Sequence, residues 1–270
     1  MNDIAIYINS FDGYSDIWPA FFMIWDNYWN DCPYNIYLST NMKKYNYKGL
    51  TCLQVGEEIN WFERTIKSLE NISEEYIIFF LEDYFISKKI NSDLIEEIVQ
   101  HMREEDLYYY QLTKSENMES IENNKAYIKI LSDKPYPISL QLVIWKRERF
   151  IKILNDLYNK GEYKSPWDFE RYFYYKYKNE ELRVLQGIEQ DSRDIFGYKN
   201  GVLQGKWIRS TLRFYKLRGI EIDTKGREIM SIRETFFYNI KKFLSDNLNK
   251  KNKQVLKILM KKFGFKFMIE

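Results

Sequence analysis

A continuous apolar run that ends in two acids constrains this chain more than any other feature. Residues Tyr76–Leu81 are Tyr-Ile-Ile-Phe-Phe-Leu, and Glu82 and Asp83 follow at once. Six residues are too few for a buried helix, and β-branched and aromatic side chains favour a strand that is covered on both faces. We therefore expect this segment to be the central strand of an α/β sheet.

Strand-like and helix-like segments alternate along the first half of the chain. Residues 4–8 form an apolar strand pattern, and aromatic residues recur at helical spacing over 18–29. The pattern then predicts a strand at 35–39, helices at 59–69 and 94–102, strands near 107–112, 126–131 and 138–144, and helices at 147–158 and from 165 onward. Such alternation predicts right-handed crossovers and a mostly parallel, Rossmann-like sheet flanked by helices, with ligands at the carboxyl ends of its strands.

The chain has the length of one large domain. It contains 270 residues, 45% of them hydrophobic, and no segment rich in Pro, Gly and Ser interrupts it. We therefore expect one α/β domain over residues 1–215 and a basic helical extension over residues 216–270.

The positive charge lies in the C-terminal tail. Residues 236–270 carry nine lysines and two acidic residues, a net charge of +7, whereas residues 1–235 carry 32 basic and 37 acidic residues, a net charge of −5. Apolar residues and lysines interleave over 255–262, as in a basic amphipathic helix that lies on an anionic membrane surface. A solvated helix packed on the domain explains the same pattern equally well. The acidic main body and the lack of a recognised binding motif argue against nucleic acid as a partner.

Several classes of enzyme need residue patterns that this sequence does not show. Cys32 and Cys52 are too few for a disulfide framework, and neither stands in a Cys-x-x-Cys or Cys/His cluster. His101 is the one histidine, and neither a His-centred relay nor a Gly-x-Gly-x-x-Gly or Walker-type loop is visible. This argues against triad hydrolases, dinucleotide oxidoreductases and P-loop enzymes. With no signal-peptide pattern and no apolar run of membrane-spanning length, we expect a cytoplasmic protein.

Glu82 and Asp83 are the strongest candidates for chemistry, because they lie at the carboxyl end of the expected central strand. Two buried carboxylates are costly without a cation, and a Mg²⁺ or Mn²⁺ ion that bridges a nucleotide diphosphate takes carboxylate and phosphate oxygens together. Adjacent strand residues point to opposite faces, so we expect Asp83 to bind the metal and Glu82 to contact the sugar or support the site. A strand-end acid pair satisfied by backbone donors or by an arginine is the competing interpretation.

The segment from Ser165 to Glu170 has the features of a helix start. Ser165 suits the N-cap, Pro166 the first helical position, and Asp168 can reach back in a capping box. Glu170 lies beyond the cap, which makes it the better candidate for a general base that accepts a proton from an acceptor hydroxyl. An ordinary exposed helical glutamate is the alternative.

Two loops offer further ligand-binding residues. In the first, Asp12 suits a hydrogen bond to a base or ribose and Tyr14 suits stacking, although both also fit an ordinary strand-to-helix turn. In the second, Gly205 permits close backbone approach and Lys206 offers an ammonium group to a diphosphate, although a solvated lysine is the commoner outcome.

Asn200-Gly201 carries a local structural signal. The dipeptide lies between strand-like residues 195–198 and 202–207. Asn-Gly favours the tight turn that joins two antiparallel strands, so the sequence predicts a β-hairpin centred on these two residues.

Four stretches resemble a family of bacterial glycosyltransferases that build capsular and other surface polysaccharides, with a GT-A-like nucleotide-diphospho-sugar fold. The stretches are YSDIWPAFFMIWDNYWNDCP at 14–33, YIIFFLEDYF at 76–85, SLQLVIW at 139–145 and SPWDFE at 165–170. They span most of residues 1–210, and their order is more specific than any one of them. The tail after residue 215 lies outside the resemblance.

The resemblance implies a glycosyltransferase that moves a sugar from a nucleotide-diphosphate donor, with a UDP-sugar favoured, to a hydroxyl of a lipid-linked or growing glycan. The donor would meet Asp12, Tyr14, Glu82, Asp83 and Lys206; Gln141 and Trp167 would contact the acceptor; and Glu170 or Asp168 would be catalytic. Adjacent acids replace the usual Asp-x-Asp, which leaves a metal requirement open. A non-catalytic membrane-surface scaffold and, less favoured, a glycoside hydrolase are the rival interpretations.

Overall fold

The computed structural model describes residues 3–57, 60–113, 126–131, 137–178, 184–193 and 195–247. They fall into two compact units, Met1–Gly201 and Val202–Glu270. The expected boundary near residue 215 lies within a helix of the second unit, and the expected amphipathic helix at 255–262 lies outside the described residues.

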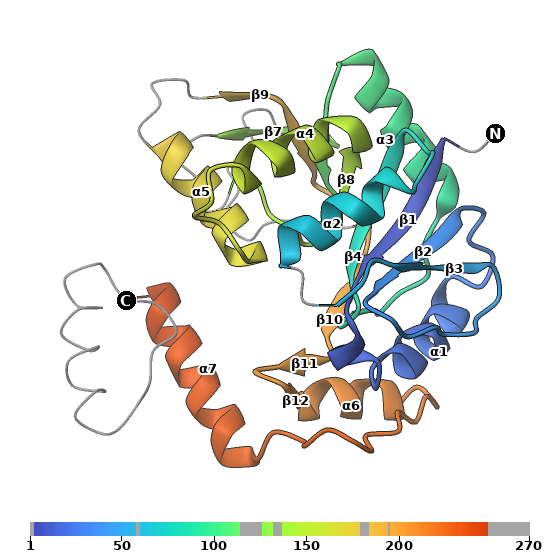
Figure 1. Cartoon of the computed structure of the whole chain (residues 1–270). Helices are drawn as coiled ribbons and strands as arrows, with labels where there is room; N and C mark the ends of the chain where they lie inside the picture. Colours follow the sequence, from blue (N-terminus) through green and yellow to red (C-terminus); the bar gives the residue numbers. More distant parts are fainter. Residues whose placement is uncertain are drawn as a thin grey trace. The chain divides into compact units, whose positions relative to one another are not determined.

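The first unit contains ten strands and five α-helices among its described residues (Figure 1). The strands are β1 (Ile4–Asn9), β2 (Asn35–Thr40), β3 (Leu50–Gln54), β4 (Tyr76–Leu81), β5 (Tyr84–Ile86), β6 (Tyr109–Gln111), β7 (Tyr127–Leu131), β8 (Val143–Lys146), β9 (Val184–Asp191) and β10 (Tyr198–Asn200). The helices are α1 (Trp18–Tyr28), α2 (Trp61–Glu70), α3 (Ser92–Glu104), α4 (Arg147–Tyr158) and α5 (Pro166–Lys178).

The main sheet has eight strands in the order β3-β2-β1-β4-β8-β6-β9-β7. Its pairs are parallel except those made by β8 and β7, which run antiparallel to their neighbours. This confirms the expected α/β class and mostly parallel sheet. The apolar run at Tyr76–Leu81 is the central strand β4, and its first five residues are buried.

Side-chain alternation along the strands divides the core between the two faces of the sheet. Residues such as Tyr7 and Phe79 face one cluster with α2, α4 and α5, where Phe150 and Phe169 pack. On the other face, Phe80 meets aromatic side chains of α1. The sheet is therefore covered on both sides, which explains why β1 and β4 are continuous apolar runs.

The predicted hairpin at Asn200-Gly201 is wrong. β10 pairs antiparallel with β5, and the Gly201 N–H donates to the Asp83 carbonyl oxygen at 2.7 Å. A Cβ on Gly201 would lie 2.5 Å from the Phe85 ring, so this position needs glycine for close packing. The hairpin turn lies four residues later, at Gln204-Gly205.

The second unit contains that hairpin and two helices among its described residues. Strands β11 (Val202–Leu203) and β12 (Lys206–Trp207) pair antiparallel, and α6 (Arg209–Lys216) and α7 (Ile232–Asn247) follow. Gln204 and Gly205 both have positive φ, at 52° and 76°, as a two-residue type I′ turn requires. None of the helices that the structure describes is long and apolar enough to cross a membrane.

The predicted strand at 138–144 is shorter than expected. β8 begins only at Val143, because Leu142 takes a left-handed backbone conformation with φ of 46°. The residues before it form a turn that carries Ser139 and Gln141 toward polar partners rather than along the sheet. Polar and apolar residues alternate over 138–142 because this segment is a turn next to polar groups and not because it continues the strand.

Candidate functional site

We call the region outside the carboxyl ends of β1 and β4 the crevice, because the order of the strands predicts that ligands bind there. From β1 the chain progresses outward through β2 and β3, and it then returns to add β4 on the other side of β1. Ligands of open α/β sheets bind at such a reversal of strand order, outside the carboxyl ends. The loop after β1 contains Asp12 and Tyr14, and the residues after β4 are Glu82 and Asp83.

Glu82 and Asp83 form the turn between β4 and β5. Glu82 is buried, with 7% of its surface exposed, and Asp83 is half-buried. Because the chain turns here, strand alternation does not send the two carboxylates to opposite faces of the sheet. Strand alternation therefore gives no reason to assign Glu82 and Asp83 different roles.

Tyr84 shows which acids gather at this turn. Burial raises the pKa of its phenol well above the usual value, and the neighbouring Tyr198 adds to the effect. The carboxylates of Asp83, Glu170 and Glu82 raise the pKa further. Three candidate acids from two distant segments thus lie within electrostatic reach of one hydroxyl group.

Gln141 joins the same cluster through Tyr198. The rings of Tyr84 and Tyr198 lie 4.9 Å apart, and the Tyr198 hydroxyl donates to Gln141 Oε1 at 3.3 Å. Gln141 is exposed, so the other end of its side-chain amide can meet a ligand. The residue expected on the acceptor side is therefore connected, through Tyr198 and Tyr84, to the turn that carries the acid pair expected on the donor side.

Glu170 is held by the turn before β8. Its Oε1 accepts hydrogen bonds from the Leu140 N–H at 2.9 Å and from the Ser139 hydroxyl at 3.1 Å. Burial raises the pKa of Glu170, while these two donors partly oppose the effect. A positioned carboxyl group with a raised pKa is well suited to accept a proton near neutral pH.

The carboxylate of Asp168 forms hydrogen bonds that cap the start of α5. Its Oδ2 accepts hydrogen bonds from the Ser165 N–H, the Ser165 hydroxyl and the Lys164 N–H, and its Oδ1 is paired with Arg171. Burial alone would raise its pKa, but these partners hold the pKa at about 2. The capping box expected from the sequence is present, and such an acidic group is a weak base. Trp167, next to it, is 63% exposed.

Arg64 is a candidate site residue that the sequence analysis missed. It lies on α2 with its guanidinium 5.4 Å from the centre of the Phe11 ring, in the loop after β1. Burial lowers its pKa, and the neighbouring Tyr7 and Glu82 partly oppose that effect. Its buried Nε has no hydrogen-bond partner among the described residues. A half-buried cation next to Glu82 with an unused donor is suited to an anionic ligand.

Buried hydrogen bonds fix α2 against the end of β1. The Asn9 amide donates to the Tyr7 hydroxyl at 2.9 Å and to the Thr65 hydroxyl at 3.0 Å, and Asn9 Oδ1 accepts the Trp61 indole N–H at 2.9 Å. Thr65 follows Arg64 directly in the chain. The network therefore holds the first two turns of α2, and with them Arg64, in a defined position. No local pattern distinguishes Arg64 in the sequence, because its setting arises from this long-range packing.

Asp12 links the loops that follow β1 and β2. Its carboxylate accepts the backbone N–H groups of Asn41, Met42 and Lys43 at 2.9–3.0 Å, and its own N–H donates to Asn41 Oδ1 at 3.0 Å. Tyr14 packs its half-buried ring against Phe11, with 4.9 Å between the ring centres. Asp12 thus shapes the wall of the crevice, whatever else it contacts.

Lys206 lies in the second unit. Its ammonium group forms ion pairs with Glu228 at 2.8 Å and with Glu234 at 2.9 Å. Hydrogen bonds with these two partners raise the pKa of Lys206, and its slight desolvation opposes them only in part. Binding a diphosphate would therefore require Lys206 to exchange these carboxylates for phosphate.

The acid pair fits a hard divalent cation. Within the part of the chain that the structure describes, no three His, Cys, Asp or Glu side chains gather into a metal-binding group. Mg²⁺, however, is commonly bound through one or two carboxylates together with substrate phosphates. The adjacent oxygen donors of Glu82 and Asp83 match that mode of binding.

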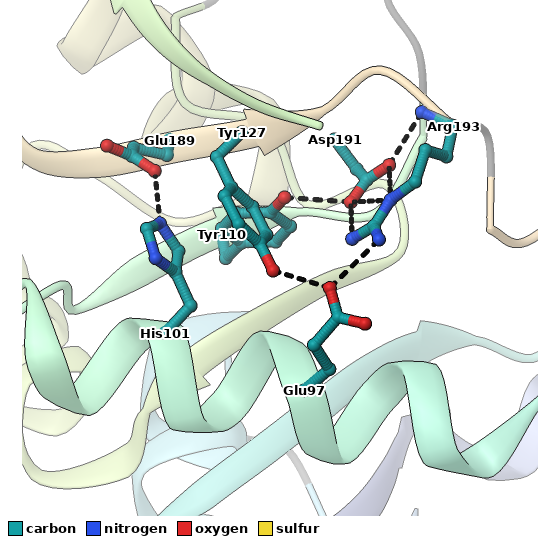
Figure 2. A network of polar contacts seen from close by, with 7 residues as sticks. All are labelled: Glu97, His101, Tyr110, Tyr127, Glu189, Asp191 and Arg193. Atoms are coloured by element: carbon teal, nitrogen blue, oxygen red, sulfur yellow. Dashed lines mark hydrogen bonds and ion pairs between the residues drawn. The ribbon is translucent and has the colours of Figure 1, made fainter. Parts of the chain in front are cut away.

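A second polar cluster lies on the α3 face of the sheet (Figure 2). There the fully buried Asp191 accepts the Tyr110 hydroxyl at 2.8 Å and pairs with Arg193 at 2.9 Å, and His101 Nε2 lies 2.7 Å from a Glu189 oxygen. Glu97 of α3 is paired with Arg193. Each of these acids has a partner within the protein, so we assign this cluster to the attachment of β9 to α3.

Comparisons with known proteins give weak structural similarities. No family model matches the chain, and neither does any curated protein. The crystal structure of S. aureus TarS 1-349 in complex with UDP-GlcNAc is 12% identical over 80% of this chain and 64% of that chain, with a TM-score of 0.46. The glycosyltransferase GlyE of Streptococcus pneumoniae is 9% identical over 65% of this chain and 44% of that chain, with a TM-score of 0.39.

A nucleotidyltransferase gives a match of the same quality. The 2-C-methyl-D-erythritol 4-phosphate cytidylyltransferase of Thermus thermophilus is 7% identical over 82% of this chain and 100% of that chain, with a TM-score of 0.45. This chain spans less than two thirds of the TarS and GlyE chains. Similarities at these levels place the chain in no family, and the geometry of the site has to carry the functional argument.

Proposed function

We propose that this protein is a nucleotide-sugar-dependent glycosyltransferase with a GT-A-like fold. The observation that carries the proposal is a chain of contacts between Glu170 and the Glu82-Asp83 turn: Ser139 binds Glu170, Gln141 two residues later binds Tyr198, and the Tyr198 ring lies 4.9 Å from Tyr84, directly after Asp83. A transferase of this kind needs an anion-binding part for the diphosphate and a base for the acceptor hydroxyl, and the crevice offers candidates for both.

On the donor side, Arg64 is the residue we assign to the diphosphate. Its guanidinium offers a planar set of donors that matches phosphate oxygens, and its buried Nε gains a partner when a phosphate binds. Asp12 and Tyr14 border the same crevice and are assigned to the nucleoside. If Asp83 and Glu82 hold Mg²⁺ or Mn²⁺, the ion supplies neutralisation of the leaving diphosphate.

On the acceptor side, Glu170 is assigned as the general base. The acceptor oxygen forms a bond to the anomeric carbon, the bond from that carbon to the diphosphate breaks, and the nucleoside diphosphate leaves with the electron pair. The acceptor proton passes to Glu170. One base and a direct displacement favour inversion at the anomeric carbon. Gln141 and the exposed Trp167 are assigned to the acceptor glycan.

Biological context follows from the resemblance and the tail charge. We propose a surface polysaccharide or glycan, lipid-linked during synthesis, as the acceptor. The protein then works in the cytoplasm at the inner face of the membrane, where the +7 tail is attracted to anionic lipids.

The test is a thermal-shift and calorimetry panel of UDP-, GDP-, CMP- and dTDP-sugars, each with and without Mn²⁺. We expect one nucleotide class, with UDP-sugars tested first, to raise Tm, and we expect Arg64→Gln and Asp83→Asn to weaken the effect. Lys67→Gln is the matched control, because Lys67 lies on the same helix but is exposed and paired with Glu63. If no nucleotide sugar stabilises the protein with or without metal, the proposed function is wrong.

A further inference from the structure

A hollow lies at the opposite end of the sheet from the candidate active site. It lies between α4 and α5 and has a volume of about 290 Å³. Tyr108, directly before β6, contributes to its wall, as does Arg149 in the first turn of α4. Since β6 runs parallel to β4, the start of β6 belongs to the amino edge, whereas Glu82 lies at the carboxyl edge.

Two tyrosines and two cations form a connected wall. The Arg149 guanidinium lies 5.5 Å from the centre of the Tyr108 ring, and the Lys176 ammonium lies 5.1 Å from the centre of the Tyr177 ring. A side-chain hydrogen bond joins Tyr108 and Tyr177. The two cation–aromatic pairs are therefore linked across the gap between β6 and α5.

The Tyr108 ring packs closely against the backbone of β9. A Cβ on Gly187 would lie 2.7 Å from this ring, so glycine is what allows the close approach. The Tyr108 N–H also donates to the Gly187 carbonyl oxygen at 2.9 Å. The wall thus has a fixed aromatic surface on which the rest of a ligand can pack.

The cations of the hollow lack acidic partners. Arg149, Lys152 and Lys176 form no ion pair within 4.0 Å with any residue that the structure describes, although Asp156 shares the hollow with them. By contrast, Lys146 at the same edge lies 3.6 Å from Glu75. Three cations and one carboxylate leave the lining with a net charge of +2.

We infer that this hollow binds a phosphate dianion, either free or carried by a phosphorylated sugar. Two negative charges match the excess of +2, and an arginine fork with two lysine ammonium groups suits tetrahedral oxygens. The half-buried Tyr108 ring would pack against a sugar. This binding is separate from the proposed transfer reaction and does not depend on it.

The test is isothermal titration calorimetry at pH 8 and low salt, with inorganic phosphate, glucose 6-phosphate and, as a neutral control, glucose. The double variant Arg149→Gln/Lys152→Gln should weaken phosphate binding at least tenfold, with an unchanged Tm because both side chains are exposed. Lys160→Gln is the matched control, because Lys160 also lies over a tyrosine ring, Tyr172, but outside the hollow. It should leave the affinity unchanged.

Four further outcomes complete the test. Tighter binding of glucose 6-phosphate than of phosphate supports a phosphorylated sugar as the ligand, and equal binding supports free phosphate. Binding that survives the double variant but disappears in Arg64→Gln would belong to the crevice at the other edge and would overturn the inference. Absence of any binding at millimolar phosphate would overturn it too, without bearing on the nucleotide-sugar panel.

Discussion

The Ser139 hydroxyl donates a hydrogen bond of 3.1 Å to Glu170 Oε1, which also accepts the Leu140 N–H at 2.9 Å. Ser139 is itself held in place, because its backbone N–H donates to the buried Tyr109 hydroxyl at 3.0 Å. These contacts connect the core of the sheet to the proposed base. Ser139 is therefore a positioning residue that acts through Glu170.

The first prediction concerns Ser139→Ala. A hydroxyl donor stabilises the charged form of Glu170, so its removal should raise the pKa of Glu170 further above the usual value. The acidic limb of the pH–rate profile should move to higher pH, with a larger loss of kcat at pH 6 than at pH 8. Ser139→Thr, which keeps a hydroxyl, should restore much of the profile. A uniform loss at all pH values would instead indicate a purely structural role.

The second prediction concerns Glu170→Gln, which should lower kcat and raise the stability of the folded protein at high pH. Because burial raises the folded-state pKa, the folded protein holds the proton more tightly than the unfolded chain does. The stabilisation that Glu170 gives the folded protein is complete below the pKa of its carboxyl group in the unfolded chain. It is lost as the pH rises through the pKa of that group in the folded protein. The neutral glutamine avoids that loss, so Tm should exceed that of the wild type at pH 8 and approach it near pH 4.

The kinetic consequence of Glu170→Gln is measured in the same samples. Loss of a general base should lower kcat by about 10²- to 10⁴-fold, with nucleotide-sugar affinity little changed. A variant that keeps wild-type kcat would remove Glu170 from the proposed mechanism, whatever its effect on Tm.

The third prediction concerns Arg64→Gln. Hydrogen bonds to a charged group contribute about 1.5–3 kcal/mol, so the dissociation constant of the nucleotide-sugar should rise roughly 10- to 100-fold. The affinity for the nucleoside without phosphates should stay the same, since Arg64 is assigned to the diphosphate. Equal weakening for the nucleoside and the nucleotide-sugar would show that Arg64 acts on the fold of the crevice instead.

Much of the fold could be predicted because its strongest elements carry local patterns. β4 is a six-residue apolar run, and α2 and α3 show apolar residues at helical spacing and begin at the asparagine caps Asn60 and Asn91. Missed elements lack such patterns. β3 is an edge strand that buries only Leu53, and β9 contains Gly187, which has φ of 71°.

The site was less predictable than the fold because its residues acquire their roles from distant contacts. The turn at Glu82-Asp83 is stabilised by Gly201, more than a hundred residues later, and a strand pattern alone placed the acids on opposite faces. Arg64 is unremarkable in the sequence, since it becomes half-buried only when α2 packs against the end of β1. Glu170 could be singled out from the sequence, but its contact with Ser139 depends on the left-handed turn at Leu142.

The last prediction separates the two acids of α5. Asp168→Asn should weaken the capping box with Ser165 and cost about 1 kcal/mol of stability, while leaving kcat within a few fold of the wild type. Since the folded pKa is lowered to about 2, the stability from Asp168 is present above its unfolded pKa and is lost as pH falls toward 2. The difference in Tm between wild type and Asp168→Asn should therefore be large at pH 7 and shrink below pH 4.

A Ser165→Ala variant should reproduce the loss of stability at pH 7, because it removes the other half of the same cap. If Asp168→Asn lost as much kcat as Glu170→Gln while keeping its Tm, the base would be Asp168, and the assignment of the two acids would have to be reversed.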